Sequence, residues 1–372
     1  MAAAREFSGL DRGSAALRRR RPALLRWFAA HERDLPWRRT RDPYAIWIAE
    51  VMLQQTQVAT VVPYYRRFLA RFPDVAALAA AEEEEVLGCW SGLGYYRRAR
   101  SLHAGARRLL RDHGGRLPRD AAALRALPGV GRYTAGAIAS IAFDLAEPVL
   151  DGNVRRVLAR VLALRGAGVE AALWGAAAEL VPGAAPGRLN QALMELGALV
   201  CTPAAPRCPR CPLRTVCRAR ARGQPEAFPA GRARPRPVAV RVGIAWVRRG
   251  PRVLLQRWTS GNPLRGSWDL PAVEIDAGAE PAASLRRKLL EAGLEAAVGR
   301  PLVALRHGIM RRRLTLDVLD CRLRRGRVAG RPELRWADPA ELGAVSGATR
   351  KVVSALCPAG RAAEKSGTGT EP

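Results

Sequence analysis

A single carboxylate stands inside an apolar run that extends from Ala45 to Leu53. Asp42-Pro43 supplies a helix start just upstream, so Glu50 is expected on a helix among hydrophobic neighbours. Removal from water would raise the pKa of Glu50 toward neutrality, and a carboxyl that is protonated near pH 7 can act as a general acid. A core glutamate paired with a buried arginine fits the spacing equally well. The amides of Gln54-Gln55-Thr56-Gln57 favour the chemical interpretation, because they suit a surface that wedges between bases or contacts their edges.

A Gly-x-Gly turn lies between two helical patterns in the segment 127–135. It resembles a helix-hairpin-helix, in which glycines let the backbone approach a phosphate while N–H groups at the start of the second helix point at it. Gly129-Val130-Gly131 is therefore a candidate DNA contact, although an ordinary helix–helix turn is the more frequent explanation of this pattern alone. A second carboxylate, Asp151, opens another helical pattern, where it could be a plain N-cap, a catalytic group, or both.

Four cysteines crowd into one short loop with the spacing Cys-x6-Cys-x2-Cys-x5-Cys. Four thiolates so close together can enclose one small metal centre, and the spacing modestly favours an iron–sulfur cluster. Zinc is the alternative, although four-cysteine zinc sites usually present two Cys-x2-Cys pairs separated by a longer span. The predicted ligands are Cys201, Cys208, Cys211 and Cys217. The remaining cysteines, expected to be core or incidental residues, are Cys89, Cys321 and Cys357.

The chain of 372 residues carries a formal net charge of +29 and has a pI near 11.4, because Lys and Arg number 62 and Asp and Glu only 33. Such a surface attracts nucleic acid above all. A GC-rich genome could explain arginine in place of lysine, but not the excess of basic over acidic residues. No run of about 18 uncharged apolar residues exists, which argues against a transmembrane helix. The crowded cysteines and the lack of a secretory signal indicate a reducing compartment, so we expect a cytoplasmic bacterial protein associated with the nucleoid.

Hydrophobic periodicity and proline-rich segments divide the chain into two folded parts, in keeping with a length too great for one ordinary domain. The first part is nearly all-α, and the second is α+β. Expected helices cover 58–72, 102–112, 134–143 and 281–291, and expected strands cover 238–247, 253–257 and 314–323. The predicted parts are a basic N-terminal arm (1–21), a helical domain (22–222) with the cysteine loop (201–217), a proline-rich linker (223–237), an α+β domain (238–357) and a disordered tail (358–372).

Together these motifs make the chain similar to the endonuclease III superfamily of helix-hairpin-helix DNA glycosylases, and within it to the MutY family of adenine glycosylases. The hairpin, the segment Leu150-Asp151-Gly152-Asn153 and the cysteine loop are shared by the superfamily, in which the loop holds a 4Fe–4S cluster. The resemblance covers most of the chain and implies a multi-domain protein, with an all-α glycosylase domain followed by a Nudix-like domain. Segments that look like MutY in particular are Leu35–Arg38, Glu50–Thr56, Trp90–Tyr96 and Asn190–Gly197.

The resemblance implies base excision repair of adenine mispaired with 8-oxoguanine or guanine in double-stranded DNA, by a monomer that flips the adenine out of the stack. Glu50 would protonate adenine N7 as a general acid. Asp151 would stay ionised and stabilise the oxocarbenium-like sugar and its attacking water, with Tyr133 as a hydrogen-bonding neighbour. By similarity, the adenine pocket is lined by Trp37, Arg38 and Glu195. The expected DNA contacts are Gln55 and Tyr95, which would invade the stack near the lesion, together with Thr56, Gly129, Val130, Gly131 and His307.

The positions of the lysines bear on the type of glycosylase. Lysine occurs only as Lys288, Lys351 and Lys365, so the helical domain lacks the amine with which bifunctional glycosylase-lyases form a Schiff base. In the endonuclease III pattern that lysine lies two residues after the second glycine of the hairpin, where this chain has Tyr133. The expected enzyme is therefore monofunctional and uses water.

The C-terminal domain resembles the Nudix-related domain with which MutY proteins sense 8-oxoguanine. Arg287 and Leu290 stand where the Nudix pattern needs metal-binding carboxylates, so nucleotide hydrolysis is not expected. Several MutY proteins carry a Phe-Ser-His loop that reads the oxidised base, and the comparable stretch here is His307-Gly308-Ile309-Met310-Arg311. In this altered loop Ile309 could still pack, and Arg311 could still meet a phosphate or a base edge.

The sequence opposes three alternatives to this interpretation. An endonuclease III-like glycosylase/lyase acting on oxidised pyrimidines is opposed by the missing lysine and by the second domain. A non-catalytic iron–sulfur protein that binds DNA or senses redox state is opposed by Glu50 and Asp151 together. A Nudix nucleotide hydrolase fused to a DNA anchor is opposed by the broken Nudix pattern.

Overall fold

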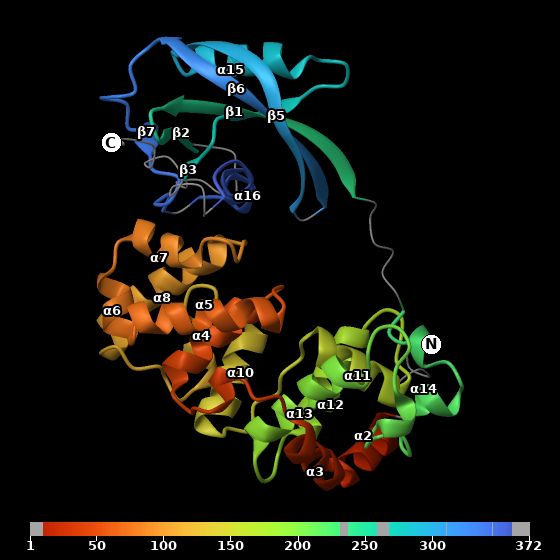
Figure 1. Ribbon diagram of the computed structural model, residues 1–372. Coiled ribbons are helices and arrows are strands. Elements are labelled where there is room, and N and C mark those ends of the chain that lie inside the picture. The colour runs from red at the N-terminus through yellow and green to blue at the C-terminus, as the bar shows by residue number, and fades with distance from the viewer. Residues whose placement is uncertain (1–9, 231–236, 259–267, 310, 344, 359–372) are drawn as a thin grey trace, which may run out of the picture. The chain divides into compact units, whose positions relative to one another are not determined.

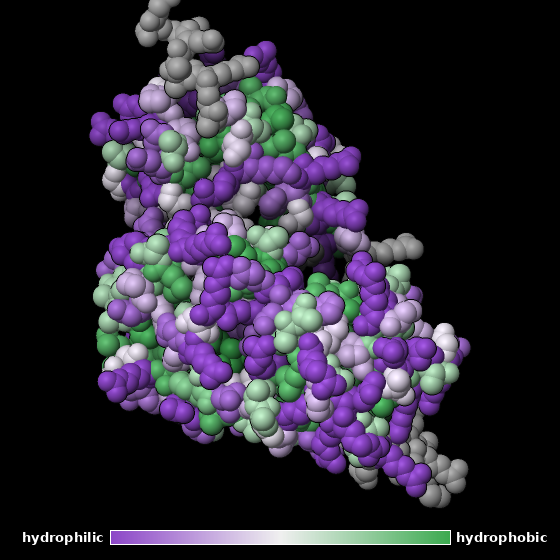
Figure 2. Space-filling model, turned by 60° about the horizontal axis from the view of Figure 1, so that its bottom comes forward, coloured by the Kyte–Doolittle hydropathy of each residue, from purple (hydrophilic) through white to green (hydrophobic). Residues whose placement is uncertain are grey.

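The computed structural model describes residues 10–230, 237–258, 268–309, 311–343 and 345–358. The chain divides into two compact units, Met1–Ala80 with Ser101–Ala233, and Ala81–Arg100 with Arg234–Pro372. We name them the helical unit and the sheet unit, and each is described by itself. Within the described residues no helix is long and apolar enough to cross a membrane. Hydrophilic side chains cover much of the face drawn in Figure 2, in keeping with the large excess of charged residues.

The helical unit is built from helices joined by short connections (Figure 1). Its elements are α2 (Leu10–Arg19), α3 (Arg21–His31), η1 (Pro36–Arg38), α4 (Pro43–Leu53), α5 (Val58–Arg71), α6 (Val75–Ala80), α9 (Ala121–Arg125), α10 (Arg132–Phe143), α11 (Gly152–Leu162), α12 (Val169–Leu180), α13 (Pro186–Leu199), η2 (Cys208–Arg210), α14 (Arg218–Ala221) and η3 (Pro225–Ala227). Helix α8 (Arg97–His113) spans the boundary between the two units.

Helix α4 begins where the sequence predicts. The Asp42 carboxylate accepts hydrogen bonds from the amides of Tyr44 and Ala45, and Pro43 takes the first helical position, where it has no intrahelical amide bond to lose. The residues from Tyr44 to Met52 are all buried, as the apolar run indicates. Glu50 is therefore carried into the interior by a helix whose other side chains hold it there.

Helix α13 lies at the centre of the helical core. It packs against α3, α10 and α11, and α10 packs in turn against α4. Gly197 lets α13 approach α11 closely, because a Cβ at this position would lie only 2.6 Å from the Cβ of Asn153. Buried Leu, Val and Ala side chains from α2, α3, α11, α12 and α13 fill the space between the helices. This packing brings α4, α10, α11 and α13 around one pocket.

The sheet unit contains a seven-stranded mixed sheet in which the order β3-β2-β1-β6-β5 is extended by β4 on β1 and β7 on β2. The β1–β6 pair is parallel, and the other named pairs are antiparallel. The elements are α7 (Glu83–Trp90), β1 (Val238–Arg249), β2 (Arg252–Arg257), β3 (Trp268–Asp269), β4 (Ala272–Ile275), α15 (Pro281–Glu291), β5 (Glu295–Ile309), β6 (Arg312–Arg325), β7 (Leu334–Ala337) and α16 (Gly347–Leu356).

Alternate residues of β1 belong to two different hydrophobic cores. Ile244 and Trp246 pack with side chains of α16, whereas Ala245 and Val247 pack with side chains of α15. Because successive side chains of a strand point to opposite faces, α15 and α16 cover opposite faces of the sheet (Figure 1). The sheet is thus buried on both sides around β1.

The fold class expected from the sequence is confirmed, since an all-α part is followed by an α+β part. The expected helices correspond to α5, α8, α10 and α15, and the expected strands to β1, β2 and β6, with some ends shifted. The long strand β5 was missed. Its pairing with β6 shifts register between Val298 and Pro301 and again before Val303, and such irregularities interrupt the alternation by which a strand is recognised.

Two further expectations differ from the structure. The stretch compared with a Phe-Ser-His loop is largely a strand, because His307, Gly308 and Ile309 end β5 and pair with residues 312–314 of β6. Met310 lies outside the described residues. Part of the predicted basic arm is helix α2, whose Leu17 is buried in the core. Residues 231–236 of the predicted linker and 359–372 of the predicted tail also lie outside the described residues.

Candidate active site

The helical unit contains a pocket of about 1720 Å³ that opens to solvent where α4, α10, α11 and α13 meet. Both carboxylates indicated by the sequence line it, and so does the tyrosine that follows the hairpin. Residues far apart in the chain therefore converge on one site. The sequence-predicted residues that line this pocket are Trp37, Arg38, Glu50, Gln55, Thr56, Gly129, Gly131, Tyr133, Asp151 and Glu195.

Glu50 is only 5% exposed and lies in the last turn of α4. Its Oε2 accepts a hydrogen bond of 2.7 Å from the Tyr133 hydroxyl, so the donor to this buried acid is a phenol. Burial raises the pKa of Glu50 to about 7. The Tyr133 hydrogen bond opposes this rise, whereas the negative charge of Asp151 adds to it. The raised pKa expected from the apolar run is confirmed.

Tyr133 lies in the first turn of α10, directly after the hairpin. Its hydroxyl also lies 3.3 Å from the sulfur of Met194. Burial, together with the nearby charges of Glu50 and Asp151, raises the pKa of Tyr133 well above its ordinary value. The phenol therefore keeps its proton and remains a hydrogen-bond donor at neutral pH.

Asp151 is both an N-cap and a pocket residue. Its Oδ1 accepts a hydrogen bond of 2.7 Å from the Val154 amide at the start of α11, and its Oδ2 accepts one of 2.9 Å from Nδ2 of Asn153. Burial raises the pKa of Asp151, and these donors act in the opposite direction. The N-cap predicted for this residue is confirmed, and its catalytic role stays a prediction.

Asn153 connects Asp151 to the cysteine loop. Its Nδ2 donates to Asp151, and its Oδ1 accepts from Nη2 of Arg156 at 2.8 Å. The Nε of Arg156 donates to the Cys201 carbonyl at 2.6 Å, while Nη2 also donates to the Gly197 carbonyl at 2.7 Å. A continuous run of hydrogen bonds therefore leads from the pocket to the first cysteine of the loop.

Glu195 is 1% exposed and accepts hydrogen bonds from two arginines. Arg33 donates to it from Nε at 2.8 Å and Nη2 at 2.7 Å, and Arg38 donates from Nη1 at 3.1 Å and Nη2 at 2.9 Å. Burial alone would raise the pKa of Glu195, but these hydrogen bonds lower it to about 2, so the carboxylate stays ionised. The sequence patterns missed Arg33, because 162 positions separate it from Glu195 and no periodicity links them.

The turn between α9 and α10 has the close backbone packing of a hairpin. Gly129 has a φ of +75°, and a Cβ there would lie 2.5 Å from the Cβ of Ser101, so glycine is required. Gly131 precedes α10, and in the described structure nothing lies within 4 Å of the point its Cβ would occupy. Val130 is buried, and its amide donates to the Leu127 carbonyl. Open space therefore surrounds the Cβ position of the glycine at the helix start.

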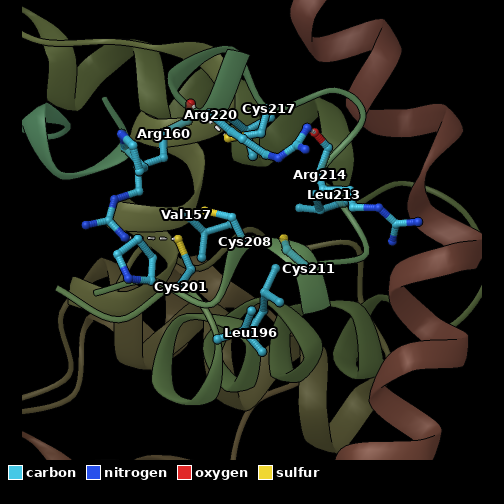
Figure 3. A pocket seen from close by; sticks show the side chains of 14 residues that line it. Val157, Arg160, Leu196, Cys201, Cys208, Cys211, Leu213, Arg214, Cys217 and Arg220 are labelled. Atoms are coloured by element: carbon cyan, nitrogen blue, oxygen red, sulfur yellow. Dashed lines mark hydrogen bonds between the residues drawn. The ribbon is translucent and has the colours of Figure 1, made fainter. Parts of the chain in front are cut away.

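The four loop cysteines line one hollow of about 390 Å³ (Figure 3). Burial raises the pKa of Cys201 and Cys217, and raises that of Cys211 to about 12. Arg160 is buried beside them and donates from Nη1 to the Cys201 sulfur at 3.4 Å, as well as to three backbone carbonyls. Within the described part of the chain, no three metal-ligating side chains come close enough to hold a single ion.

Two of the expected DNA contacts belong to the sheet unit. Tyr95 is 42% exposed and has a φ of +50°, a conformation that is uncommon for an aromatic residue. His307 is half-buried on β5, and burial lowers its pKa. In the helical unit Gln55 shares the unusual backbone of Tyr95, with a φ of +57°.

The match to a known family covers part of the site. The family model for HhH-GPD superfamily base excision DNA repair proteins matches residues 48–178, which include Glu50, the hairpin and Asp151. A solved thermostable thymine-DNA glycosylase is 31% identical with a TM-score of 0.52, and the match covers 58% of this chain and 100% of that one. The chain belongs to the HhH-GPD superfamily. A non-covalent endonuclease III–DNA complex matches at 25% identity and a TM-score of 0.50, over 56% of this chain and 97% of that one.

Curated relatives of this HhH-GPD protein are named adenine DNA glycosylases. The Homo sapiens protein is 52% identical over 220 residues, which cover 55% of this chain and 40% of the human one. The Arabidopsis thaliana protein is 42% identical over 229 residues, which cover 54% of this chain and 36% of the Arabidopsis one. A Buchnera aphidicola protein is 41% identical over 198 residues, which cover 52% of this chain and 56% of the Buchnera one. The chain thus matches about half the length of these relatives.

Proposed function

We propose that this HhH-GPD protein is a monofunctional adenine DNA glycosylase, which hydrolyses the N-glycosidic bond of adenine mispaired with 8-oxoguanine or guanine. The observation that carries the proposal is the buried Glu50, with a pKa of about 7, in one pocket with Asp151. The names of the curated relatives support adenine as the base that is removed.

Glu50 is assigned the role of general acid. At a pKa of about 7 a large share of Glu50 carries a proton at neutral pH, and transfer of that proton to N7 of a flipped adenine makes the base a leaving group. The Tyr133 hydroxyl, 2.7 Å from Oε2, fixes the carboxyl and shares the negative charge that remains after the transfer. The proton that adenine receives is therefore already bound to Glu50 before the base enters.

Asp151 is assigned the role of the stabilising anion. Donors on both carboxylate oxygens hold it in place at the N-terminus of α11 and favour its ionised form. A fixed negative charge beside the sugar stabilises positive charge that develops there as the base departs. It can also orient the water that attacks the sugar.

The adenine pocket is proposed to be formed by Trp37, Arg38 and Glu195. Trp37 offers an aromatic face, and Glu195 presents a carboxylate already ionised and oriented by its arginines. Arg33 joins this set as the second arginine on Glu195. Because each oxygen of Glu195 receives a donor from both arginines, the pocket is fixed before a base enters.

A 4Fe–4S cluster is proposed as the cofactor, with Cys201, Cys208, Cys211 and Cys217 as its ligands. The donor set fits, because four thiols line one hollow. A cluster is larger than one zinc ion, so its ligands lie farther apart. Bound there, the cluster would tie the four cysteines of the loop together, and Arg160 of α11 would neutralise part of its negative charge.

Double-stranded DNA is the proposed partner. The net charge of +29, the open helix start at Gly131 and the hairpin glycines support phosphate contacts in the helical unit. Gln55, Thr56 and Tyr95 are proposed to enter or border the base stack. The Nudix-like sensing of 8-oxoguanine by the sheet unit, with His307 as a contact, belongs to the same proposal.

The decisive experiment is a glycosylase assay on duplexes with adenine opposite 8-oxoguanine, guanine or cytosine, followed by alkali to cleave at abasic sites. Release opposite 8-oxoguanine and guanine, but not opposite cytosine, is expected. Glu50→Gln should abolish release and keep mismatch binding, whereas the control Glu170→Gln, which alters an exposed ion pair with Arg155, should keep both. Turnover by Glu50→Gln would remove Glu50 from the acid role.

The monofunctional assignment has its own test. The helical unit contains no lysine, so borohydride should trap no covalent adduct between the protein and adenine-containing DNA. The same reaction on duplexes with oxidised pyrimidines separates this proposal from an endonuclease III-like lyase. An efficient cross-link within the helical unit would refute the water route.

A further inference from the structure

The turn that carries Tyr95 is strained. Gly92 and Gly94 have φ values of +106° and +72°, and Tyr95 follows with +50°. Glycine enters this region readily, whereas an aromatic residue stays in it only where its surroundings hold it there. Trp90 and Arg98 help to stabilise this backbone conformation, since both donate hydrogen bonds to the Gly94 carbonyl, at 3.1 Å and 3.2 Å.

The two ends of the turn are held by a single carbonyl from the C-terminal part of the sheet unit. The Ser91 hydroxyl donates to the Val345 oxygen at 2.7 Å, and the Tyr96 hydroxyl donates to the same oxygen at 2.7 Å. A carbonyl oxygen has two lone pairs and can accept both bonds. Nη2 of Arg350 donates to the Ser91 oxygen at 2.8 Å, which directs the serine proton toward Val345. We call these contacts the Val345 brace.

The Val345 carbonyl is itself well fixed. Val345 is fully buried and forms a parallel bridge with Trp268. The next residue, Ser346, caps α16, and its amide donates to Oδ1 of the buried Asp269 at 3.1 Å. Burial raises the pKa of Tyr96, so its hydroxyl remains protonated and available as a donor. The rigid Val345 carbonyl therefore accepts one hydrogen bond from Ser91, before Tyr95, and one from Tyr96, after it.

Helix α7, which leads into the turn, is docked separately on the same part of the unit. Oε1 of Glu84 accepts from Nε1 of Trp268 and from Nη1 of Arg335, each at 3.1 Å. The Arg335 guanidinium lies 4.3 Å from the Trp268 ring centroid, so the arginine is held by the ring as well as by the carboxylate. This second attachment means that loss of one bond in the brace need not release the whole segment.

We propose that Ser91, Tyr96 and Arg350 are positioning residues for DNA binding, which act by bracing the Tyr95 turn against the Val345 carbonyl. The inference rests on the proposed function, because it takes Tyr95 as a DNA contact. Without the brace, the turn relaxes from its left-handed conformation, and DNA must restore that conformation on binding. The cost falls on affinity and not on the chemical step, because neither the turn nor the brace lines the carboxylate pocket.

The brace can be tested first without DNA. Tyr96→Phe removes the donor and keeps the ring. The matched control is Tyr44→Phe, because the Tyr44 hydroxyl is also buried and donates to a backbone carbonyl, that of Phe72 at 2.9 Å. Hydrogen exchange of the amides in 92–96 should speed up roughly fivefold in Tyr96→Phe, the weight of one buried hydrogen bond, and stay unchanged in the control. Unchanged exchange in Tyr96→Phe would overturn the brace.

The consequence for DNA is tested by a double-mutant cycle. Tyr96→Phe should raise the Kd for a duplex with adenine opposite 8-oxoguanine roughly fivefold, and the single-turnover rate at saturating enzyme should not change. In a Tyr95→Ala background, Tyr96→Phe should have no further effect on Kd. An undiminished effect there would show that Tyr96 acts by another route and would overturn the proposal. Failure of the proposed function shows itself differently, as absence of adenine release by the wild-type chain.

Discussion

Glu50→Gln should stabilise the folded protein above neutral pH while it abolishes adenine release. Burial raises the pKa of Glu50 from an ordinary value of 4.5 to about 7. The folded state therefore favours the protonated acid, and the stability that Glu50 contributes is fully present below about pH 4.5 and is lost as the pH rises through about 7. At about 1.4 kcal/mol per pKa unit, ionised Glu50 costs the folded state about 3 kcal/mol near pH 8. A neutral amide removes that cost.

The measurement is urea unfolding of the wild type and Glu50→Gln between about pH 5 and about pH 8. The difference in free energy of unfolding should be small at the acidic end and grow toward about 3 kcal/mol at the alkaline end. Glu195→Gln is the control. Burial raises the pKa of Glu195, but the bonds from Arg33 and Arg38 lower it by more, to a net value of about 2. Replacement of Glu195 should therefore destabilise the protein throughout this pH range. A pH-independent difference for Glu50→Gln would refute the reasoning.

Three further substitutions test the parts of the pocket. Tyr133→Phe removes a hydrogen bond that favours the ionised form of Glu50, so the pKa of Glu50 should rise by about one unit. The alkaline limb of the single-turnover pH profile should move up with it, and a downward shift would contradict this. Asp151→Asn can keep the N-cap but loses the bond from Nδ2 of Asn153, so it should stop adenine release at a cost of about 1 kcal/mol, against about 2 kcal/mol for Asp151→Ala, which loses both bonds. Gly129→Ala should weaken both stability and DNA affinity, and adding Ser101→Gly should restore part of each.

Local signals in the sequence were enough to place the two carboxylates on their helices. Asp42-Pro43 marks the start of α4, and the apolar run that follows predicts the burial of Glu50. Asp151 caps α11 as its position before a helical pattern indicates. Capping and periodicity act among residues a few positions apart, so they can be recognised without the fold.

Contacts between distant parts of the chain had no such signal. The Tyr133–Glu50 bond joins residues 83 positions apart, and 254 positions separate Ser91 from Val345. The resemblance to a family supplied Tyr133, but periodicity alone did not indicate the bond. Nor does a local pattern show that residues 81–100 cluster with the sheet unit, because the partners that hold them there lie far downstream. Such pairings follow from tertiary packing, which one sequence does not display.

The two carboxylates of the pocket stand at opposite ends of their helices, which modifies the effect of burial on the pKa of each. Asp151 stands at the N-terminus of α11, where amides lack helical acceptors and the positive end of the dipole favours an anion. Glu50 stands in the last turn of α4, where amides are already used within the helix and the negative end of the dipole disfavours a carboxylate. These positions suit the roles proposed for them, a proton donor at Glu50 and a fixed anion at Asp151. Exchange of the two positions would weaken the proposed acid, because N-terminal amides oppose the effect of burial on the pKa of a carboxylate and leave it less protonated at neutral pH.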